Sequence, residues 1–175
     1  MPECYADTLL IETLVPTKSG YNHQHSCFQV EREMRFGKLK DQFAVGIIDK
    51  DKEAIKYLNE FEEIGKVTGS LILWKHKKDE KHHYIIQICP ALEKWILEIC
   101  EAEAIDIAEF GLSSDLKELT QKTKSRSSME NQQLKDLFRN ISLKDGNLSV
   151  QKLKGWVKYL KEKNYKADIK ALQNG

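Results

Sequence analysis

The sequence predicts an α/β fold, in which a small and mostly parallel sheet is flanked by helices and followed by a helical C-terminal extension. Two observations support this prediction. Short, uncharged apolar runs, such as residues 43–48 (FAVGII), have the length and composition of strands covered on both faces. Longer segments with apolar residues at helical spacing lie between these runs, so strands and helices alternate along the chain.

The composition is that of one folded domain, or of one domain with a small appendage. Of the 175 residues, 41% are hydrophobic and 31% are charged, which excludes a disordered tail. No run approaches the ~18–20 apolar residues that a membrane span needs, and the first residues show no signal-peptide pattern. We therefore expect a cytoplasmic protein with no membrane partner, whose four widely spaced cysteines are reduced.

In the first part of the chain we expect two strands and two helices. Residues 8–15 (TLLIETLV) form an apolar run that predicts a first strand carrying one glutamate. A capping-box pattern from Ser26 to Gln29 predicts a helix that ends near Gly37. The strand over 43–48 follows, and we expect a second helix over about 52–64.

Further along, residues 70–74 and 84–89 predict two more strands, separated by a charged hairpin tip. Pro90 suits the first position of a helix whose buried stripe includes Trp95. Beyond about residue 103 the pattern is helical, with a polar loop over 120–128. Two amphipathic helices follow, over about 129–141 and 149–163.

The charges are distributed unevenly along the chain. Residues 1–112 contain 14 basic and 20 acidic residues, whereas residues 113–175 contain 14 basic and 7 acidic residues. We therefore expect an α/β domain over residues 1–112 and a basic helical extension over 113–175, packed on that domain or appended to it. Such an asymmetry suits metal chemistry beside a polyanion, although basic helical faces are commonly just solvated.

Two aspartates directly follow the most buried of the predicted strands. Ligands of open α/β sheets bind outside the carboxyl ends of the strands, and an extended Asp49-x-Asp51 directs both carboxylates to one side. Mg²⁺ or Mn²⁺ would relieve their mutual repulsion. In the alternative interpretation, Asp51 caps the next helix while Lys50 and Lys52 neutralise the pair.

Two glutamates are further candidates for this metal site. Glu12 lies inside an apolar run, where a carboxylate is costly to bury without a partner, and a parallel neighbouring strand would bring it to Asp49. Otherwise Glu12 faces solvent or pairs with a lysine. Glu93 lies beside an apolar helical face, so it is either a fourth carboxylate of the site or part of a buried salt bridge.

An apolar strand that carries a glutamate (LLIETLV), followed after a helix by a strand that ends in DxD (VGIIDKD), resembles the TOPRIM domain. This domain occurs in topoisomerases, bacterial primases, ribosomal RNA maturases and overcoming-lysogenisation-defect nucleases. The resemblance covers residues 7–65 and implies that Glu12, Asp49 and Asp51 hold Mg²⁺ for the breakage or joining of phosphodiesters. Members of the family usually show an EGxxD-like run, whereas Glu12 is followed by Thr13, Leu14 and Val15.

Other side chains could take part in binding. His23 and His25 form an HxH spacing that is compatible with zinc or with a proton shuttle, although no third soft ligand is identifiable. Two groups of basic residues could contact phosphates, with solvated loops as the plain alternative. They are Lys75, Lys77 and Lys78 in the hairpin, and Lys122, Lys124 and Arg126 in the basic extension.

The sequence thus predicts a Mg²⁺- or Mn²⁺-dependent protein that processes the phosphodiester backbone of a nucleic acid, with Glu12, Asp49 and Asp51 as catalytic residues. One alternative is a non-catalytic α/β binding or regulatory module with a protein partner. Another is a haloacid-dehalogenase-like phosphatase in which Asp49 forms an aspartyl-phosphate. The sequence speaks against the phosphatase, because Glu53 stands where that family expects Thr or Val and no downstream acidic pair is found.

Overall fold

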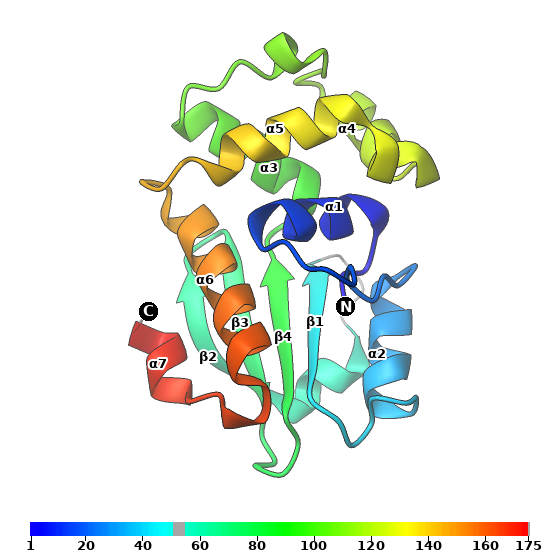
Figure 1. Cartoon of the computed structure of the whole chain (residues 1–175), viewed down its shortest axis with the longest axis vertical. Coiled ribbons are helices and arrows are strands. Elements are labelled where there is room, and N and C mark those ends of the chain that lie inside the picture. The colour runs from blue at the N-terminus through cyan, green and yellow to red at the C-terminus, as the bar shows by residue number, and fades with distance from the viewer. Residues whose placement is uncertain (51–54, 175) are drawn as a thin grey trace.

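A computed structural model describes residues 1–50 and 55–174 and shows an α/β protein built on a four-stranded sheet (Figure 1). The strands are β1 (Ala44–Asp49), β2 (Phe61–Val67), β3 (Leu71–His76) and β4 (His83–Ile88), in the order β1-β4-β3-β2. β1 and β4 are parallel, whereas the other two pairs are antiparallel. The expected mostly parallel sheet is therefore wrong, because the links from β2 to β3 and from β3 to β4 are too short for crossover helices.

The first residues of the chain extend the sheet beside β1. Pro2 forms an isolated parallel bridge with Ile47. The N–H of Glu3 donates to the carbonyl of Ile47 at 3.0 Å, and the N–H of Ile47 donates to the carbonyl of Met1 at 3.0 Å. Glu3 therefore lies at the same end of the sheet as the last residue of β1.

The strand expected over residues 8–15 is wrong, because this segment belongs to helix α1 (Tyr5–Leu14). The positions of Asp7, Leu10, Ile11 and Leu14 follow the i, i+3, i+4, i+7 pattern, and all four side chains are buried. The run has a single charged residue, Glu12, so its composition also fits a strand that is covered on both faces. α1 crosses the carboxyl ends of β1 and β4 (Figure 1).

The flanking helices agree in part with those that the sequence predicts. α2 (Cys27–Arg35) is confirmed, and its N-cap Ser26 accepts a hydrogen bond from the N–H of Gln29. α3 (Leu92–Ala102) is confirmed after Pro90. The helix expected over 52–64 is wrong in its described part: a 3₁₀ turn (Lys56–Glu60) leads directly into β2, and residues 51–54 lie outside the described structure.

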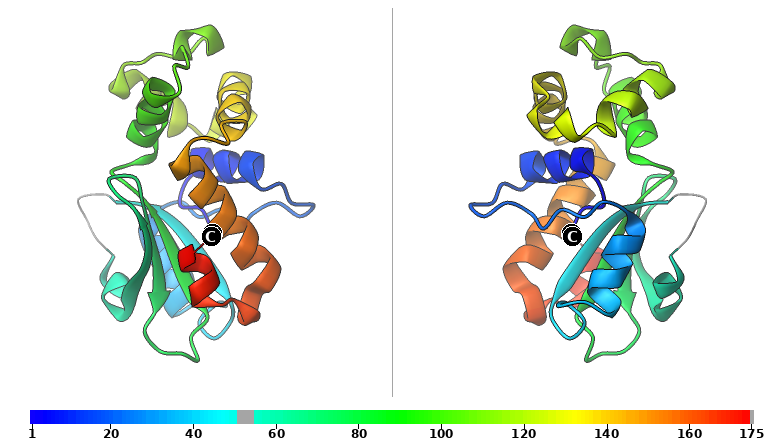
Figure 2. Two further views of the ribbon diagram at one scale, coloured as in Figure 1. Left: turned by 90° about the vertical axis from the view of Figure 1, so that its left-hand side faces the viewer. Right: turned by 90° about the vertical axis from the view of Figure 1, so that its right-hand side faces the viewer.

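The basic extension contributes α4 (Leu116–Thr123), α5 (Gln132–Ser142), α6 (Leu148–Lys163) and α7 (Ile169–Asn174). The two expected amphipathic helices are confirmed as α5 and α6. The polar loop expected over 120–128 is instead the end of α4 and part of a 3₁₀ turn (Arg126–Glu130). Figure 2 shows α6 and α7 against one face of the sheet, with α4 and α5 beyond its end.

One apolar core joins the two parts of the chain. Ile86 and Ile88 of β4 belong to the same buried cluster as Phe138 of α5 and Leu160 of α6. Ile85 points to the other face and joins a second cluster under α2 and the turn at 56–60. β4 is thus buried on both faces, and all six of its residues are buried. Within the described ranges, no helix combines the length and apolar character needed to cross a bilayer.

Gly46 of β1 lies directly under α2, so we expect Gly46→Val to destabilise the fold. A Cβ at this position would lie 2.8 Å from Cγ1 of Val30 and 3.2 Å from Sδ of Met34. Overpacking of this kind costs about 1–3 kcal/mol in the free energy of unfolding, measurable by urea denaturation. Gly155 of α6 is the control, because a Cβ there meets no atom of the described structure within 4 Å. Gly155→Ala should instead stabilise the protein by about 0.5–1 kcal/mol, and a loss there would contradict this explanation.

Candidate acidic site at the end of β1

Asp49 is the last residue of β1 and faces the beginning of α3. Its Oδ1 accepts a hydrogen bond from the N–H of Leu92, the first residue of that helix, at 2.9 Å. The positive end of the helix dipole stabilises a carboxylate at this place. Because β1 and β4 are parallel, the chain leaves both strands at the same end of the sheet. The sequence predicted that Asp49 lies at this carboxyl end, outside which ligands of open α/β sheets bind.

Asp7 of α1 is buried next to Asp49. The residue is 1% exposed, and neither of its carboxylate oxygens has a nitrogen or oxygen hydrogen-bond partner among the described residues. A contact with the thiol of Cys4 stabilises the charge of Asp7 only in part. Burial raises the pKa of Asp7 well above its ordinary value, and the negative charges of Asp49, Glu3 and Glu93 raise it further. The negative charge of Asp7 is therefore costly in this protein unless a proton or a cation compensates it.

Two glutamates complete the acidic cluster, which we define as Glu3, Asp7, Asp49 and Glu93. Glu3 follows the bridge to β1, and Glu93 lies in the first turn of α3 with 7% exposure. The hydroxyl of Thr123 donates a hydrogen bond to Glu93, and no lysine of residues 1–50 or 55–174 forms a salt bridge with it. Three separate segments of the chain thus bring carboxylates to one end of the sheet.

The structure does not bring Glu12 to this cluster. Glu12 lines a different cavity, with Lys135 and Arg139 of α5. The reason is the helix: five residues along an α-helix turn the side chain by roughly 140° relative to Asp7. The expected convergence of Glu12 with Asp49 is thus corrected, and Glu3 and Asp7 stand near Asp49 instead. Asp51 lies outside the described residues, and its role stays a prediction.

The burial of Asp7 could have been predicted from the sequence. Asp7 begins the apolar stripe of Leu10, Ile11 and Leu14, so a helical interpretation of this segment places a carboxylate on the buried face. Nothing local marks Glu3, because its place depends on the pairing of residues 1–3 with a strand more than 40 positions away.

The cluster is not a finished coordination sphere. Across residues 1–50 and 55–174, no three His, Cys, Asp or Glu side chains are already arranged to hold a metal ion. Carboxylate oxygens are nevertheless the ligands that hard cations prefer. Chemically, the cluster can take up protons or concentrate a divalent cation.

His23 and His25 lie beside the acidic cluster. The ring of Tyr5 stacks on His23 with 4.0 Å between the centroids, and the two imidazoles are 4.9 Å apart. The hydroxyl of Thr8 donates to the carbonyl of Cys4, so Nδ1 of His23 carries the proton and donates to Oγ1 of Thr8 at 3.1 Å. Burial lowers the pKa of His23, which favours this neutral form.

The two basic groups predicted to contact nucleic acid differ in position. Lys75 is 5% exposed, and its Nζ donates to the carbonyls of His76 and Lys81 at 2.8 Å each. It closes the hairpin and is not presented to a phosphate, which corrects the prediction. Lys77 and Lys78 are exposed in the same hairpin. Figure 1 shows this hairpin at the end of the sheet opposite to α1, whereas Asp49 ends β1 on the side of α1.

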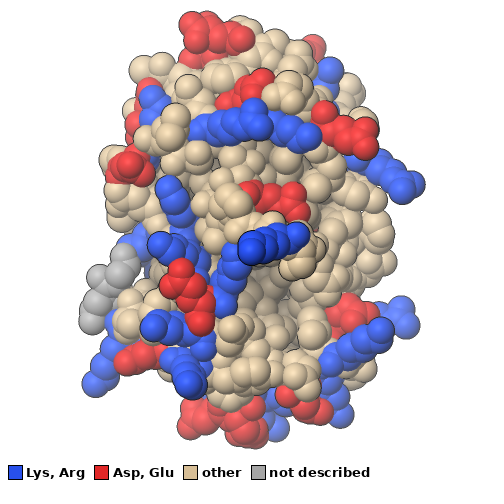
Figure 3. All heavy atoms as spheres, viewed as in Figure 1, with Lys and Arg blue, Asp and Glu red and all other residues tan. Residues whose placement is uncertain are grey.

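Lys122, Lys124 and Arg126 are exposed at the end of α4 and in the turn that follows. Lys124 also lines a cavity together with Glu3, so this basic group lies on the side of the acidic cluster. On the face seen in Figure 3, basic side chains are interspersed with acidic ones, and a row of basic atoms crosses the region of α5. The basic residues of the extension are thus partly dispersed among acidic residues on this face.

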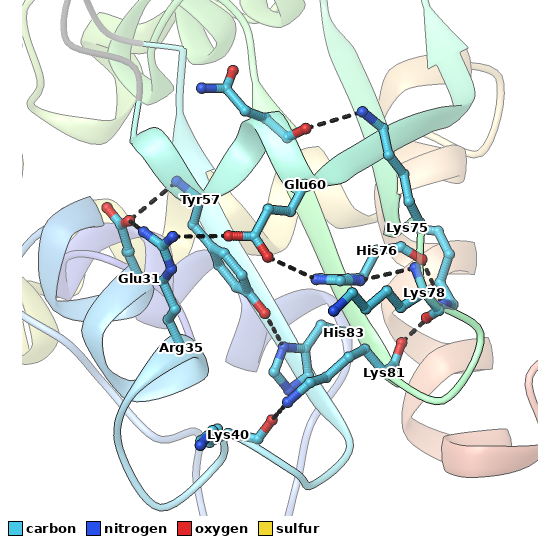
Figure 4. A network of polar contacts seen from close by, with 12 residues as sticks. Glu31, Arg35, Lys40, Tyr57, Glu60, Lys75, His76, Lys78, Lys81 and His83 are labelled. Carbon is cyan, nitrogen blue, oxygen red and sulfur yellow. Dashed lines mark hydrogen bonds and ion pairs between the residues drawn. The ribbon is translucent and has the colours of Figure 1, made fainter.

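A second polar network lies at the other end of the sheet (Figure 4). Nε2–H of the fully buried His83 donates to the carbonyl of Leu39 at 2.9 Å, so Nδ1 accepts a hydrogen bond from the hydroxyl of Tyr57 at 2.7 Å. Burial lowers the pKa of His83, and this arrangement needs the neutral imidazole.

The network continues through a histidine and a chain of ion pairs. Nδ1 of His76 accepts a hydrogen bond from the N–H of Lys78, so Nε2–H donates to Glu60 at 3.3 Å. Glu60 pairs with Arg35 at 2.9 Å, and Arg35 also pairs with Glu31 at 3.3 Å. These contacts join α2, the turn at 56–60 and the sheet, which indicates a structural role in holding α2 against the sheet.

Comparisons with known proteins identify no relative: no family model matches the chain, and neither a curated protein nor a solved structure matches it significantly.

The burial of Asp7 predicts a pH-dependent gain in stability for Asp7→Asn. Between the ordinary pKa of 3.8 and the raised native pKa, the native state binds more protons than the unfolded state, so the wild-type protein loses stability as the pH rises. The asparagine variant escapes this loss and should melt at least about 2 °C higher near neutral pH. The difference in melting temperature should shrink towards pH 4; a variant that melts lower at neutral pH would refute the raised pKa of the buried Asp7.

The hydrogen bond from Tyr57 to His83 predicts that Tyr57→Phe destabilises the protein. The substitution leaves a buried acceptor without its donor, which costs about 1–3 kcal/mol in the free energy of unfolding. Tyr165 provides the control, since its hydroxyl contacts Gln42 at the surface and the residue is 50% exposed. Urea denaturation should show a much smaller loss for Tyr165→Phe, and equal losses would argue against the buried network.

Proposed function

We propose that this chain is a Mg²⁺- or Mn²⁺-dependent protein that acts on the phosphodiester backbone of a nucleic acid. Glu3, Asp7 and Asp49 hold the cation in this proposal, with Glu93 as a further carboxylate and Asp51 as the partner that the sequence predicts. The observation that carries the proposal is the carboxylate of Asp7, which is buried at 1% exposure beside other acids and has no nitrogen or oxygen hydrogen-bond partner among the described residues; only the thiol of Cys4 offsets its charge in part.

A hard divalent cation fits this arrangement better than a proton alone. One proton would neutralise Asp7 but would leave the repulsion among Asp49, Glu3 and Glu93 in place. A divalent cation offsets two charges and binds carboxylate oxygens directly. The N–H of Leu92 orients the carboxylate of Asp49, which prepares it as a ligand.

The resemblance to the TOPRIM domain supports the same residues, with a changed assignment of the glutamate. The EGxxD-like run of that family places an aspartate four residues after its glutamate, and Glu3-Cys4-Tyr5-Ala6-Asp7 has this spacing with Cys4 in place of glycine. The DxD of the family corresponds to Asp49 and Asp51. Glu12 has no part in this assignment.

The chemistry follows from these positions. When bound, the cation would activate a water molecule and stabilise the charge on the leaving oxygen of a phosphodiester. The carboxylates of the cluster fix the place of attack at the end of β1. Lys122, Lys124 and Arg126 are exposed nearby and would contact the phosphates of the backbone.

Cation binding predicts a thermal shift that depends on the acidic cluster. At a concentration about 100-fold above the dissociation constant, Mg²⁺ or Mn²⁺ stabilises the protein by about 2.7 kcal/mol, which raises the melting temperature by several degrees. Asp7→Asn and Asp49→Asn should abolish this shift. Glu12→Gln is the matched control, because Glu12 lies on the same helix as Asp7 and outside the cluster, so this variant should keep the full shift.

The outcomes separate the candidate functions. Metal-dependent cleavage of plasmid DNA or structured RNA, lost in both aspartate variants, supports the enzyme. A thermal shift without cleavage supports the non-catalytic module, and phosphate release from a phosphomonoester with Asp49 phosphorylated would support the phosphatase. Absence of a thermal shift in the wild-type protein, or a shift that survives in both aspartate variants, rejects the proposed site.

A further inference from the structure

A cavity of about 430 Å³ lies beside the acidic cluster, between the beginnings of α1 and α2. Its walls are residues 3–5, His23, residues 25–28 and Lys124. Glu3 belongs both to this cavity and to the acidic cluster. A ligand in the cavity therefore lies next to any cation that the carboxylates hold.

One wall of the cavity is built from flat rings. Tyr5 and His23 are stacked, and His25 stands edge-on to both, with 5.8 Å between its centroid and that of Tyr5. The hydrogen bond from His23 to Thr8, a residue that is 2% exposed, holds this group in place. Phe28 adds a further ring and is 51% exposed, which leaves a large apolar surface in water at the mouth of the cavity.

Positive charge stands on the same cavity. Lys124 is exposed and lines it from the end of α4. The nine-residue helix α2 begins at Cys27 on the cavity wall, so the positive end of its dipole faces the space. Rings and positive charge together match a ligand that has both a planar base and a phosphate.

We propose that this cavity binds one nucleotide unit of a single-stranded nucleic acid. Its base stacks on Phe28 and the Tyr5–His23 pair, and its phosphate lies near Lys124 and the start of α2. The strand is single because a base must be unpaired to stack on a protein ring. The proposal rests on the proposed function, and it names the form of nucleic acid that the acidic cluster acts upon.

The test is fluorescence anisotropy with a labelled oligothymidylate in EDTA at low salt, so that no divalent cation takes part. The wild-type protein should bind it, and Phe28→Ala should weaken binding by at least about five-fold, the effect of losing one stacked base. Lys124→Gln should weaken binding and reduce its dependence on salt. Both side chains are exposed, so the variants should fold, and circular dichroism checks this.

Matched controls lie on the same helices. Phe36, at the other end of α2, is 69% exposed and is not part of this cavity, so Phe36→Ala should bind like the wild-type protein. Lys117 of α4 is exposed and likewise outside the cavity, so Lys117→Gln should have no effect. Excess duplex of the same length and a polyglutamate peptide should compete weakly.

Several results would overturn the proposal: no binding by the wild-type protein, equal losses in the Phe36 and Phe28 variants, or equal competition by polyglutamate. The cation experiment is independent of this one. A metal-dependent thermal shift together with unchanged binding in Phe28→Ala would reject the nucleotide site alone. Weakened binding in Phe28→Ala and Lys124→Gln without any metal shift would reject the proposed function and keep the site.

Discussion

The pairing of residues 1–3 with β1 determines the geometry of the candidate site. The bridge between Pro2 and Ile47 fixes Glu3 at the end of the sheet where β1 ends, and α1 begins two residues later. Asp7 is therefore carried over the carboxyl end of the sheet, where it meets Asp49. A slip of this pairing by one residue would turn Glu3 to the other side and move α1 along the sheet.

This arrangement places the carboxylate of Asp7 in a part of the protein from which packed apolar side chains exclude water. Leu10, Ile11 and Leu14 of α1 pack into the main core, and Asp7 is buried with them on the same face of the helix. Ionising this carboxylate costs stability, because no nitrogen or oxygen among the described residues hydrogen-bonds to it and the thiol of Cys4 offsets the charge only in part. A residue of this kind is characteristic of sites that bind a cation or a proton rather than of packing, because packing alone would favour an uncharged side chain.

The two ends of the sheet therefore differ in character. At the end of β1, acidic side chains, stacked rings and an exposed lysine surround open space. At the other end, polar groups that also line a cavity satisfy one another: Tyr57 bonds to His83, and the partly exposed Glu60 to Arg35 and His76 (Figure 4). Polar groups that bond to each other stabilise the fold, whereas a buried carboxylate such as Asp7, whose charge its neighbours oppose, remains able to bind a proton or a cation.

Local pattern by itself determined much of this protein. The buried strand that ends in Asp49, the capped helix after Ser26 and the helix after Pro90 all follow from short-range rules of burial, capping and proline geometry. The type of α1 could also have been predicted, since its apolar stripe has a helical period that includes Asp7. Tertiary structure alone decided that β1 pairs with the distant β4, and that Glu3 rather than Glu12 approaches Asp49. The reason is that strand pairing and helix rotation depend on contacts between distant segments, which no window of neighbouring residues contains.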